Sequence, residues 1–175
     1  MSQTFESARL TMRPQRLDDA EALFEAYGDT ELMRYWSSGP HADLAETLAY
    51  MAPRVDRSDW RSWSITERES HRVIGTVSAG QRRAGVVEIG YLLVRSAWGR
   101  GYAREAVSRL IDLLVRDEGN RRVFADTDPD NAASNTLLET LGFRREGYLR
   151  AEWETHIGVR DTILWGLLAK EWTDR

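Results

Sequence analysis

The stretch Glu88-Ile-Gly-Tyr-Leu-Leu-Val-Arg-Ser-Ala-Trp-Gly-Arg-Gly-Tyr-Ala-Arg-Glu-Ala106 joins a strand-like run to a helix-like run through a turn with two glycines. Apolar residues then recur at helical spacing from Ala103 to Leu114, which predicts a helix over 103–116. A further strand-like run follows this helix at 122–127. A strand, a helix and a second strand in this order predict one parallel crossover within a sheet.

The turn between the strand and the helix has the features of an anion-binding site. Gly99 and Gly101 carry no side chains, so an anion can approach the backbone closely. The first N–H groups of the helix point outward, and the helix dipole adds positive charge there. Arg95, Arg100 and Arg104 add fixed positive charge around the same turn. The pattern favours a phosphate-binding site; a tight turn with solvated arginines is the alternative.

Two nucleotide-binding motifs do not fit this turn. Gly99-x-Gly101-x-x-Arg104 has arginine where a dinucleotide fingerprint has its third glycine. The turn also follows several predicted strands, whereas a Rossmann unit places it after its first strand. A Walker A loop requires Gly-Lys-Ser/Thr, which the sequence lacks. We therefore expect the anion to be bound outside both of these frameworks.

The rest of the chain alternates between strand and helix periodicity. Expected strands cover 9–14, 61–65, 73–79, 86–94, 122–127, 143–153 and 159–168, with a turn over 80–85. Expected helices cover 17–27, 31–36, 44–51, 103–116 and 131–141. No repeat or linker interrupts the 175 residues. We therefore expect a single domain over 1–175, of mixed α+β class, with a mostly antiparallel sheet.

The composition excludes several classes of chemistry. The chain has no cysteine, and its three histidines are far apart, so we expect neither a thiolate nucleophile nor a Cys- or His-based metal site. Asp126-x-Asp128-x-Asp130 resembles the start of a calcium loop, but Leu137 stands where that loop needs glutamate. We therefore expect no bound metal.

Charge and hydropathy narrow the classes further. The net charge is −4, which argues against a protein that coats nucleic acid, even though 23 of the 24 basic residues are arginine. No apolar run reaches the roughly 20 residues of a membrane span, and the first residues show no signal pattern. We expect a cytoplasmic protein that binds neither membrane nor nucleic acid.

The central stretch resembles the main motif of the GNAT superfamily of acetyl-CoA-dependent N-acetyltransferases. That motif, (Gln/Arg)-x-x-Gly-x-(Gly/Ala), reads Trp98-Gly-Arg-Gly-Tyr-Ala103 here. Tryptophan at the first position departs from the general motif and is found in the branch of the ribosomal-protein N-terminal alanine and serine acetyltransferases. Segments 8–14, 131–135, 141–143, 146–148 and 160–165 are similar to the same branch. The resemblance covers about 8–169 and implies the GNAT fold, with helices on both faces of the sheet.

The resemblance also implies where acetyl-CoA binds. The cofactor is expected between strands 88–94 and 122–127, which splay apart in this family. Its pantetheine arm would pair with backbone at Leu93 and Val94, and its pyrophosphate would meet N–H groups from Gly99 to Ala103. Asn131 and Ser134 would reach it from the next helix. The full set of expected cofactor contacts is Leu93, Val94, Trp98, Gly99, Arg100, Gly101, Tyr102, Ala103, Arg104, Asn131 and Ser134.

Direct acetyl transfer needs a neutral amine and a stabilised leaving thiolate. An α-amino group has a pKa of about 7.7–8.0, whereas that of lysine is about 10.4, so an N-terminal acceptor needs only a weak base. By resemblance, Ser134 is expected to protonate the thiolate and Glu152 to act as the base; Glu154 and Glu88 are rivals for the base. The alternatives are a structural serine in a first helical turn and solvated carboxylates.

The expected function is acetyl transfer to a primary amine, most simply the N-terminal α-amine of a protein, as in the ribosomal-protein branch. Small amines such as an amino acid, a polyamine or an aminoglycoside are alternative acceptors. A non-catalytic acyl-CoA-binding sensor is a second class of function. Tyr35 and Trp36 are expected to border the acceptor, and Asp161 to receive an amine or pair with an arginine. The oligomeric state, monomer or homodimer, is left open.

Overall fold

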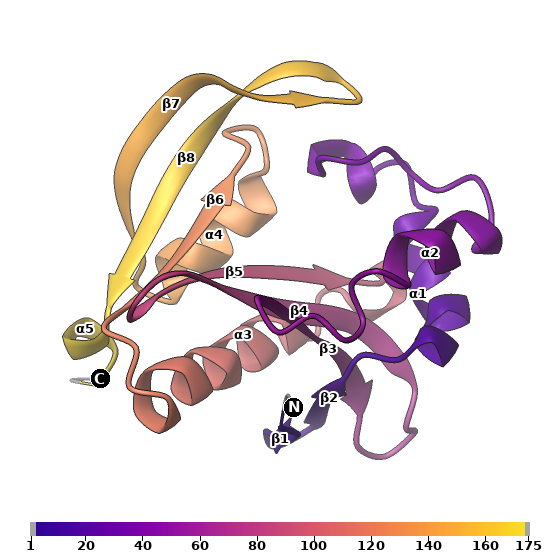
Figure 1. The fold of residues 1–175 in the computed structure, drawn as a ribbon, viewed down its shortest axis with the longest axis horizontal. Helices are drawn as coiled ribbons and strands as arrows, with labels where there is room; N and C mark the ends of the chain where they lie inside the picture. The colour runs from indigo at the N-terminus through magenta and orange to yellow at the C-terminus, as the bar shows by residue number, and fades with distance from the viewer. Residues whose placement is uncertain (1–2, 174–175) are drawn as a thin grey trace.

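A twisted eight-stranded sheet forms the centre of the computed structural model, which describes residues 3–173 (Figure 1). The strands are β1 (Phe5–Glu6), β2 (Leu10–Pro14), β3 (Trp60–Glu67), β4 (Val73–Arg83), β5 (Val86–Leu93), β6 (Arg122–Thr127), β7 (Arg144–Thr155) and β8 (Gly158–Leu168). Their order in the sheet is β1-β2-β3-β4-β5-β6-β8-β7. All neighbours are antiparallel except β5 and β6, which α3 connects as the predicted crossover.

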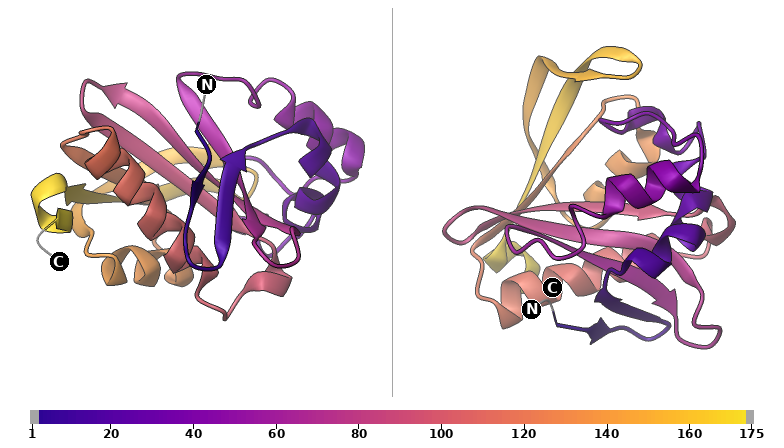
Figure 2. Two further views of the ribbon diagram at one scale, coloured as in Figure 1. Left: turned by 90° about the horizontal axis from the view of Figure 1, so that it is seen from below. Right: turned by 45° about the vertical axis from the view of Figure 1, so that its right-hand side comes forward.

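Helices cover both faces of this sheet. They are α1 (Ala20–Tyr27), α2 (Leu44–Met51), α3 (Tyr102–Asp112), α4 (Ala132–Thr140) and α5 (Ala169–Thr173), with short turns η1 (Leu17–Asp19), η2 (Met33–Tyr35), η3 (Arg95–Ala97) and the π-helical η4 (Leu113–Asp117). Figure 2 shows α3 across one side of the strands and α2 on the other. In β4, Ile74, Gly75, Thr76 and Val77 are all buried in succession, because both faces are covered.

The sequence predicts most of these elements, but the helix expected over 31–36 is only the three-residue turn η2, and three further differences stand out. The mixed, mostly antiparallel sheet and its crossover are confirmed. The expected turn over 80–85 is wrong in its extent, because β4 continues to Arg83 through a register shift between Gln81 and Arg83. The two-residue β1 and the five-residue α5 were not predicted, since segments this short carry no period.

The sheet opens beside its parallel pair. Pairing between β5 and β6 covers only Val86 to Glu88 of β5 and ends at the pair Glu88–Phe124. β5 then continues to Leu93 and β6 to Thr127 without pairing to each other. This separation of two strands leaves unpaired backbone at the centre of the molecule, and the candidate site lies there.

The β7–β8 hairpin closes one side of this opening. β8 pairs with β6, so the hairpin extends from the diverging strand and reaches over the gap (Figure 1). Its tip meets the loop before α2: a Cβ built on Gly39 would lie 3.5 Å from Cβ of His156. The hairpin and the early helices therefore face one another across the opening.

Candidate active site

Three cavities that share Tyr91 lie beside β5, near the place where β5 and β6 separate. The first, here named the α3 cavity, measures about 530 Å³ and lies between the end of β5, the start of α3 and α4. Its lining residues are Glu31, Leu32, Tyr35, Trp36, Tyr91, Leu92, Leu93, Ala97, Trp98, Gly99, Gly101, Tyr102, Ala103, Arg104, Asn131, Ala132, Ala133, Ser134 and Leu137. Nine of the eleven expected cofactor contacts are therefore on one cavity wall; Val94 and Arg100 are not.

The glycine turn adopts the geometry that an anion site needs. Gly99 and Gly101 have φ values of 74° and 75°, a region that favours glycine. Gly101 is the N-cap of α3, and no side chain caps the helix there. The first N–H groups of an eleven-residue helix are thus directed at the α3 cavity without an internal side-chain acceptor.

The three arginines predicted beside this turn differ in their partners. Arg95 pairs with Asp29 at 2.6 Å, and Arg100 lies 3.7 Å from Glu67. Arg104 lines the α3 cavity and makes no ion pair within residues 3–173. Arg104 is therefore the guanidinium that is free to meet an anion.

The open edge of β5 presents backbone groups to the α3 cavity. The N–H of Val94 donates to the Ile74 carbonyl at 2.9 Å, so residue 94 faces β4. Because strand backbone groups alternate, Tyr91 and Leu93 face the opposite edge, where β6 has moved away. The Leu93 carbonyl accepts from Trp98 Nε1 at 2.9 Å, while no strand pairs with its N–H. The backbone N–H of Leu93 therefore faces the opening, whereas the N–H of Val94 is already bonded to β4.

The second cavity, the β8 cavity, measures about 270 Å³. Its lining residues are Tyr35, Trp36, Ser37, Trp60, Glu88, Ile89, Gly90, Tyr91, Ala125, Asp126, Thr127, Asp128, Asn131, Ser134, Trp153, Thr155, Arg160, Asp161 and Thr162. It shares Tyr35, Trp36, Tyr91, Asn131 and Ser134 with the α3 cavity. The two cavities therefore meet at the start of α4, and the expected acceptor residues Tyr35 and Trp36 lie at this junction.

Ser134 is placed at the junction by a helix cap. Asn131 is the N-cap of α4, and its Oδ1 accepts the N–H of Ser134 at 3.2 Å. Tyr91, from β5, donates its hydroxyl to the Ser134 carbonyl at 3.4 Å. Burial raises the pKa of Tyr91 to about 12, so this hydroxyl keeps its proton at neutral pH. Tyr91 was not predicted, because a tyrosine on a strand matches a core residue as well as a site residue.

Glu88 is the buried carboxylate of the β8 cavity. Its side chain is 15% exposed and accepts from Arg82 Nε at 2.5 Å. Burial raises the pKa of Glu88, and the nearby charge of Asp126 acts in the same direction, while Arg82 opposes both. A carboxylate with a raised pKa on a cavity wall has the properties of a proton acceptor.

Glu152 lies elsewhere. It is exposed on β7 and is not among the residues that line the three cavities, and the rival Glu154 is not either. A bulge between Leu149 and Trp153 contains Ala151 at φ 52°, and it changes which side chains of β7 face the opening. Trp153 lines the β8 cavity and donates from Nε1 to Asp126 at 2.8 Å.

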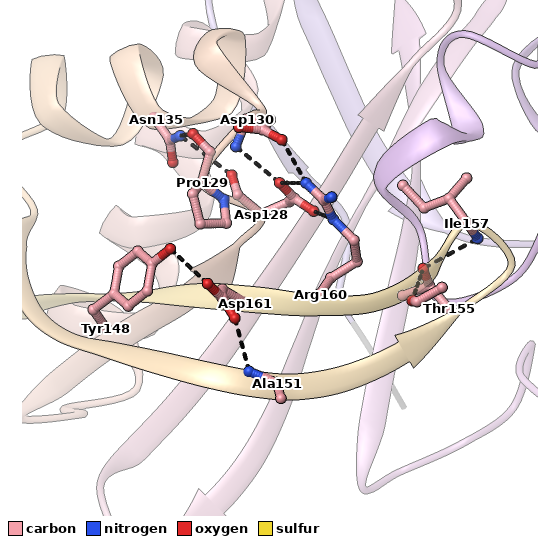
Figure 3. A network of polar contacts seen from close by, with 11 residues as sticks. Asp128, Pro129, Asp130, Asn135, Tyr148, Ala151, Thr155, Ile157, Arg160 and Asp161 are labelled. Atoms are coloured by element: carbon pink, nitrogen blue, oxygen red, sulfur yellow. Dashed lines mark hydrogen bonds and ion pairs between the residues drawn. The ribbon is translucent and has the colours of Figure 1, made fainter.

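An ion-pair cluster at the hairpin fixes the far wall of the β8 cavity (Figure 3). Arg160 of β8 pairs with Asp128 at 2.7 Å and with Asp130 at 2.5 Å, both in the segment between β6 and α4. Burial alone would raise the pKa of Asp128, but Arg160 and the Asp130 N–H bring it below its ordinary value. The cluster ties the hairpin to the segment that carries Asn131 and Ser134.

Asp161 has a different partner from those expected. It accepts from the Tyr148 hydroxyl at 2.7 Å and from the Ala151 N–H at 2.8 Å (Figure 3). These bonds keep its pKa below the ordinary value. Asp161 therefore holds the β7 bulge in place, and it makes no ion pair with an arginine in the described structure.

Two other kinds of site are absent from the described part of the chain. Within residues 3–173, no three His, Cys, Asp or Glu side chains gather as a metal site would require. None of the described helices is long and apolar enough to cross a membrane.

Comparisons with known proteins agree with this geometry. The family model described as "Acetyltransferase (GNAT) domain" matches residues 9–144. The chain is 33% identical to the "uncharacterized N-acetyltransferase p20" of Bacillus licheniformis, over 97% of this chain and 98% of that one. It is 32% identical to the [ribosomal protein uS5]-alanine N-acetyltransferase of Escherichia coli, over 49% of this chain and 44% of that one. The resemblance to the ribosomal-protein branch is therefore distant.

Solved structures share the fold. A GNAT-family acetyltransferase from Bacillus anthracis has a TM-score of 0.88 at 21% identity, covering 97% of this chain and all of that one. Spermidine N-acetyltransferase from Vibrio cholerae, in complex with CoA and spermine, has a TM-score of 0.82 at 18% identity, covering 95% and 99%. Since the family model matches most of the chain and p20 is related over nearly its full length, the chain belongs to the GNAT family and is an N-acetyltransferase.

Proposed function

We propose that this protein transfers acetyl from acetyl-CoA directly to a primary amine, within one domain whose motif core spans about 8–169. The observation that carries the proposal is the junction of the two cavities. The α3 cavity and the β8 cavity share five lining residues, among them Ser134 and Tyr91. An acetyl donor in the first and an amine in the second would therefore meet beside these two hydroxyls.

The residues that line the α3 cavity suit the chemical groups of acetyl-CoA. The uncapped start of α3 and the positive-φ glycines suit a pyrophosphate, with Arg104 as a cation on the same wall. The Leu93 edge of β5 suits the amide groups of a pantetheine arm, and Ala132, Ala133 and Leu137 form an apolar side. When bound there, acetyl-CoA supplies an activated acetyl thioester. Trp98, Tyr102, Ala103 and Asn131 also lie on this wall, whereas Val94 and Arg100 do not.

Glu88 is the carboxylate that we propose as the base. It lies on the β8 cavity wall, and its raised pKa makes it a better proton acceptor than an ordinary glutamate. It would take the ammonium proton of the acceptor, directly or through water. Glu152, outside the cavity walls, remains the rival that its own variant tests.

Ser134 is the hydroxyl that we propose to donate a proton to sulfur. Its N–H is fixed by Asn131 and its carbonyl by Tyr91, so the residue is held at the junction from both sides. The protonated Tyr91 hydroxyl is a second donor within the same wall.

For the acceptor, we propose a protein N-terminal α-amine as the first candidate. The relationship to the uS5-alanine acetyltransferase supports it, and a small amine is the second candidate, supported by the spermidine acetyltransferase neighbour. A thiol-release assay with N-terminal peptides and small amines, run at one acetyl-CoA concentration, tests both. Selective CoA release with peptides is the expected result. Tight acetyl-CoA binding without CoA release from any acceptor would instead make the chain an acyl-CoA sensor.

A further inference from the structure

A third cavity, the α2 cavity, extends the β8 cavity on the side of α1 and α2. It measures about 340 Å³. It shares Trp36, Ser37, Trp60, Gly90 and Tyr91 with the β8 cavity, so the two are continuous past a ring of aromatic side chains. At Gly90 an added Cβ would lie 2.9 Å from Ser78 Oγ and 3.8 Å from the Trp60 ring, so a larger residue would narrow the space between these two lining side chains. An acceptor whose amine lies near Glu88 can therefore extend into the α2 cavity.

The two cavities carry opposite charge. The β8 cavity is lined by the carboxylates Glu88, Asp126, Asp128 and Asp161 and by one arginine, Arg160. The α2 cavity is lined by three arginines and no carboxylate; its other polar lining side chains are neutral. A ligand that spans both is matched best when it is cationic at one end and anionic at the other.

Arg54 is the arginine of the α2 cavity that has no carboxylate partner. Arg82 pairs with Glu88 at 2.5 Å, and Arg57 donates to Asp59 at 2.9 Å. Arg54, half-buried, makes no ion pair in the described structure. Its guanidinium lies 3.8 Å from the centre of the Tyr50 ring and donates to the Tyr50 carbonyl, so it is held in place while donors remain unused.

The chemistry of the wall around Arg54 suits a carboxylate. Gln15 is buried on this wall, and Ser62, Thr76 and Ser78 add neutral hydroxyls, so nothing there repels an anion. A guanidinium offers two parallel N–H groups to the two oxygens of a carboxylate. We propose that the α2 cavity is a subsite of the acceptor and that Arg54 binds a carboxylate group of it. The proposal rests on the acetyl transfer proposed above and adds the chemical class of acceptor: an amine that also carries a carboxylate, several bonds away.

Two sources of such a carboxylate are a small ω-amino acid and an acidic side chain near a peptide N-terminus. Matched pairs separate them: 6-aminohexanoate against its amide, and the peptide amides Ala-Glu-NH₂ against Ala-Gln-NH₂. Thiol release should give a kcat/KM at least tenfold higher for the carboxylate member of one pair, and that pair identifies the source.

The Arg54→Gln variant tests the assignment. It is expected to reduce the carboxylate-to-amide ratio from tenfold or more to near one. Arg57→Gln is the matched control, because Arg57 lines the same cavity but is paired with Asp59; it should keep the ratio. An unchanged ratio in Arg54→Gln, or equal kcat/KM within both pairs for the natural sequence, overturns the proposal. Because the ratio compares two acceptors on one protein, a loss of folded protein does not alter it.

A binding measurement keeps this inference distinct from the proposed function. Calorimetry with CoA-loaded protein should show at least tenfold tighter binding of the same carboxylate members than of their amides, lost in Arg54→Gln. Such binding without any CoA release would contradict the proposed transferase reaction but support the carboxylate subsite. CoA release without any carboxylate preference in rate or binding would support the proposed transferase reaction and overturn the carboxylate subsite.

Discussion

The α3 cavity and the β8 cavity meet at Tyr91 and Ser134, but they are built in different ways. The α3 cavity is formed by two short stretches, 91–104 and 131–137, together with part of the segment 31–36. Its main polar groups are backbone groups: the open edge of β5 and the start of α3. A site of this kind binds any ligand of the right shape and charge, and it is set by local conformation.

The β8 cavity takes side chains from β3, β5, β6, β7, β8, the start of α4 and the segment 35–37. Its polar groups are carboxylates whose state depends on burial and on partners that are distant in sequence, such as Arg82 for Glu88 and Arg160 for Asp128. The difference indicates that the proposed donor site is specified by backbone and the proposed acceptor site by tertiary packing. Variants of the first should alter acetyl-CoA affinity, and variants of the second should alter acceptor kinetics.

Gly101→Glu gives the largest expected effect on this comparison. A side chain at φ 75° strains the turn, and its carboxylate would stand where the first N–H groups of α3 face an anion. We expect the affinity for acetyl-CoA to fall at least about 1,000-fold, or roughly 4 kcal/mol, in calorimetry.

Gly119→Glu is the matched control for that variant. Gly119 has φ 71°, close to that of Gly101, but it lies beyond the opposite end of α3 and η4, with open space around an added Cβ. The Gly119→Glu variant introduces the same charge and the same backbone strain as Gly101→Glu, and it should leave acetyl-CoA affinity unchanged. Equal affinity in both variants would show that the α3 turn does not bind the cofactor.

The same difference explains how much of each site the sequence predicts. Nine of the eleven expected cofactor contacts line the α3 cavity, because they lie in two short segments at the starts of α3 and α4 and are brought together by local structure. Arg95 and Arg100 pair with Asp29 and Glu67, which come from distant segments, so sequence spacing did not predict these partners. Sequence spacing predicts that an arginine is near the turn, and only the fold shows what neutralises it.

For the β8 cavity, the sequence predicts fewer of the lining residues. Glu88, Tyr35 and Trp36 are on the wall as expected, whereas Tyr91 and Arg160 were not predicted. Register shifts in β7 between Arg145 and Gly147 and between Leu149 and Trp153 change which side chains face the opening, so spacing alone does not locate Glu152.

Glu88→Gln has the second-largest expected effect. It removes the proposed base while keeping size and polarity, so kcat should fall about 100-fold with acetyl-CoA affinity unchanged. In the natural sequence, the acid limb of kcat/KM should lie above the ordinary pKa of glutamate, because burial raises the pKa of Glu88.

Glu152→Gln provides the rival measurement. If kcat falls 100-fold in Glu152→Gln and does not fall in Glu88→Gln, the base lies on the hairpin and the assignment is reversed.

A stability measurement shows whether a loss of activity in Glu88→Gln comes from the chemistry or from unfolding. The raised pKa of Glu88 in the folded protein means that ionised Glu88 costs stability above that pKa. Glu88→Gln should therefore unfold at pH 7 no more easily than the natural sequence.

Ser134→Ala should have an intermediate effect. It removes the hydroxyl at the junction and leaves the Asn131 cap intact, because the cap uses the backbone N–H. We expect kcat to fall about tenfold, with little change in either substrate affinity. Tyr91→Phe is measured in parallel. A larger fall in kcat for Tyr91→Phe would mean that Tyr91 of β5, and not Ser134 of α4, donates the proton.

Arg160→Gln should have the smallest effect on activity and is the most direct test of whether packing specifies the acceptor site. It frees the hairpin from the start of α4, so the acceptor KM should rise about threefold to fivefold while acetyl-CoA affinity stays the same. It also leaves Asp128, 6% exposed, without its cation, which should cost about 1–3 kcal/mol in the free energy of unfolding at pH 7.

The pH dependence of that loss identifies its cause. The pKa of Asp128 is lowered in the folded protein, so its stabilisation is present above the unfolded pKa and disappears as the pH falls through the folded one. The gap in unfolding free energy between the natural sequence and Arg160→Gln should therefore narrow below about pH 4. Arg144→Gln, which breaks the pair between the exposed Arg144 of β7 and Glu171 of α5, should show no such gap. A fall in acetyl-CoA affinity in Arg160→Gln would mean that the hairpin also shapes the α3 cavity, and the division between backbone and side-chain specification would no longer hold.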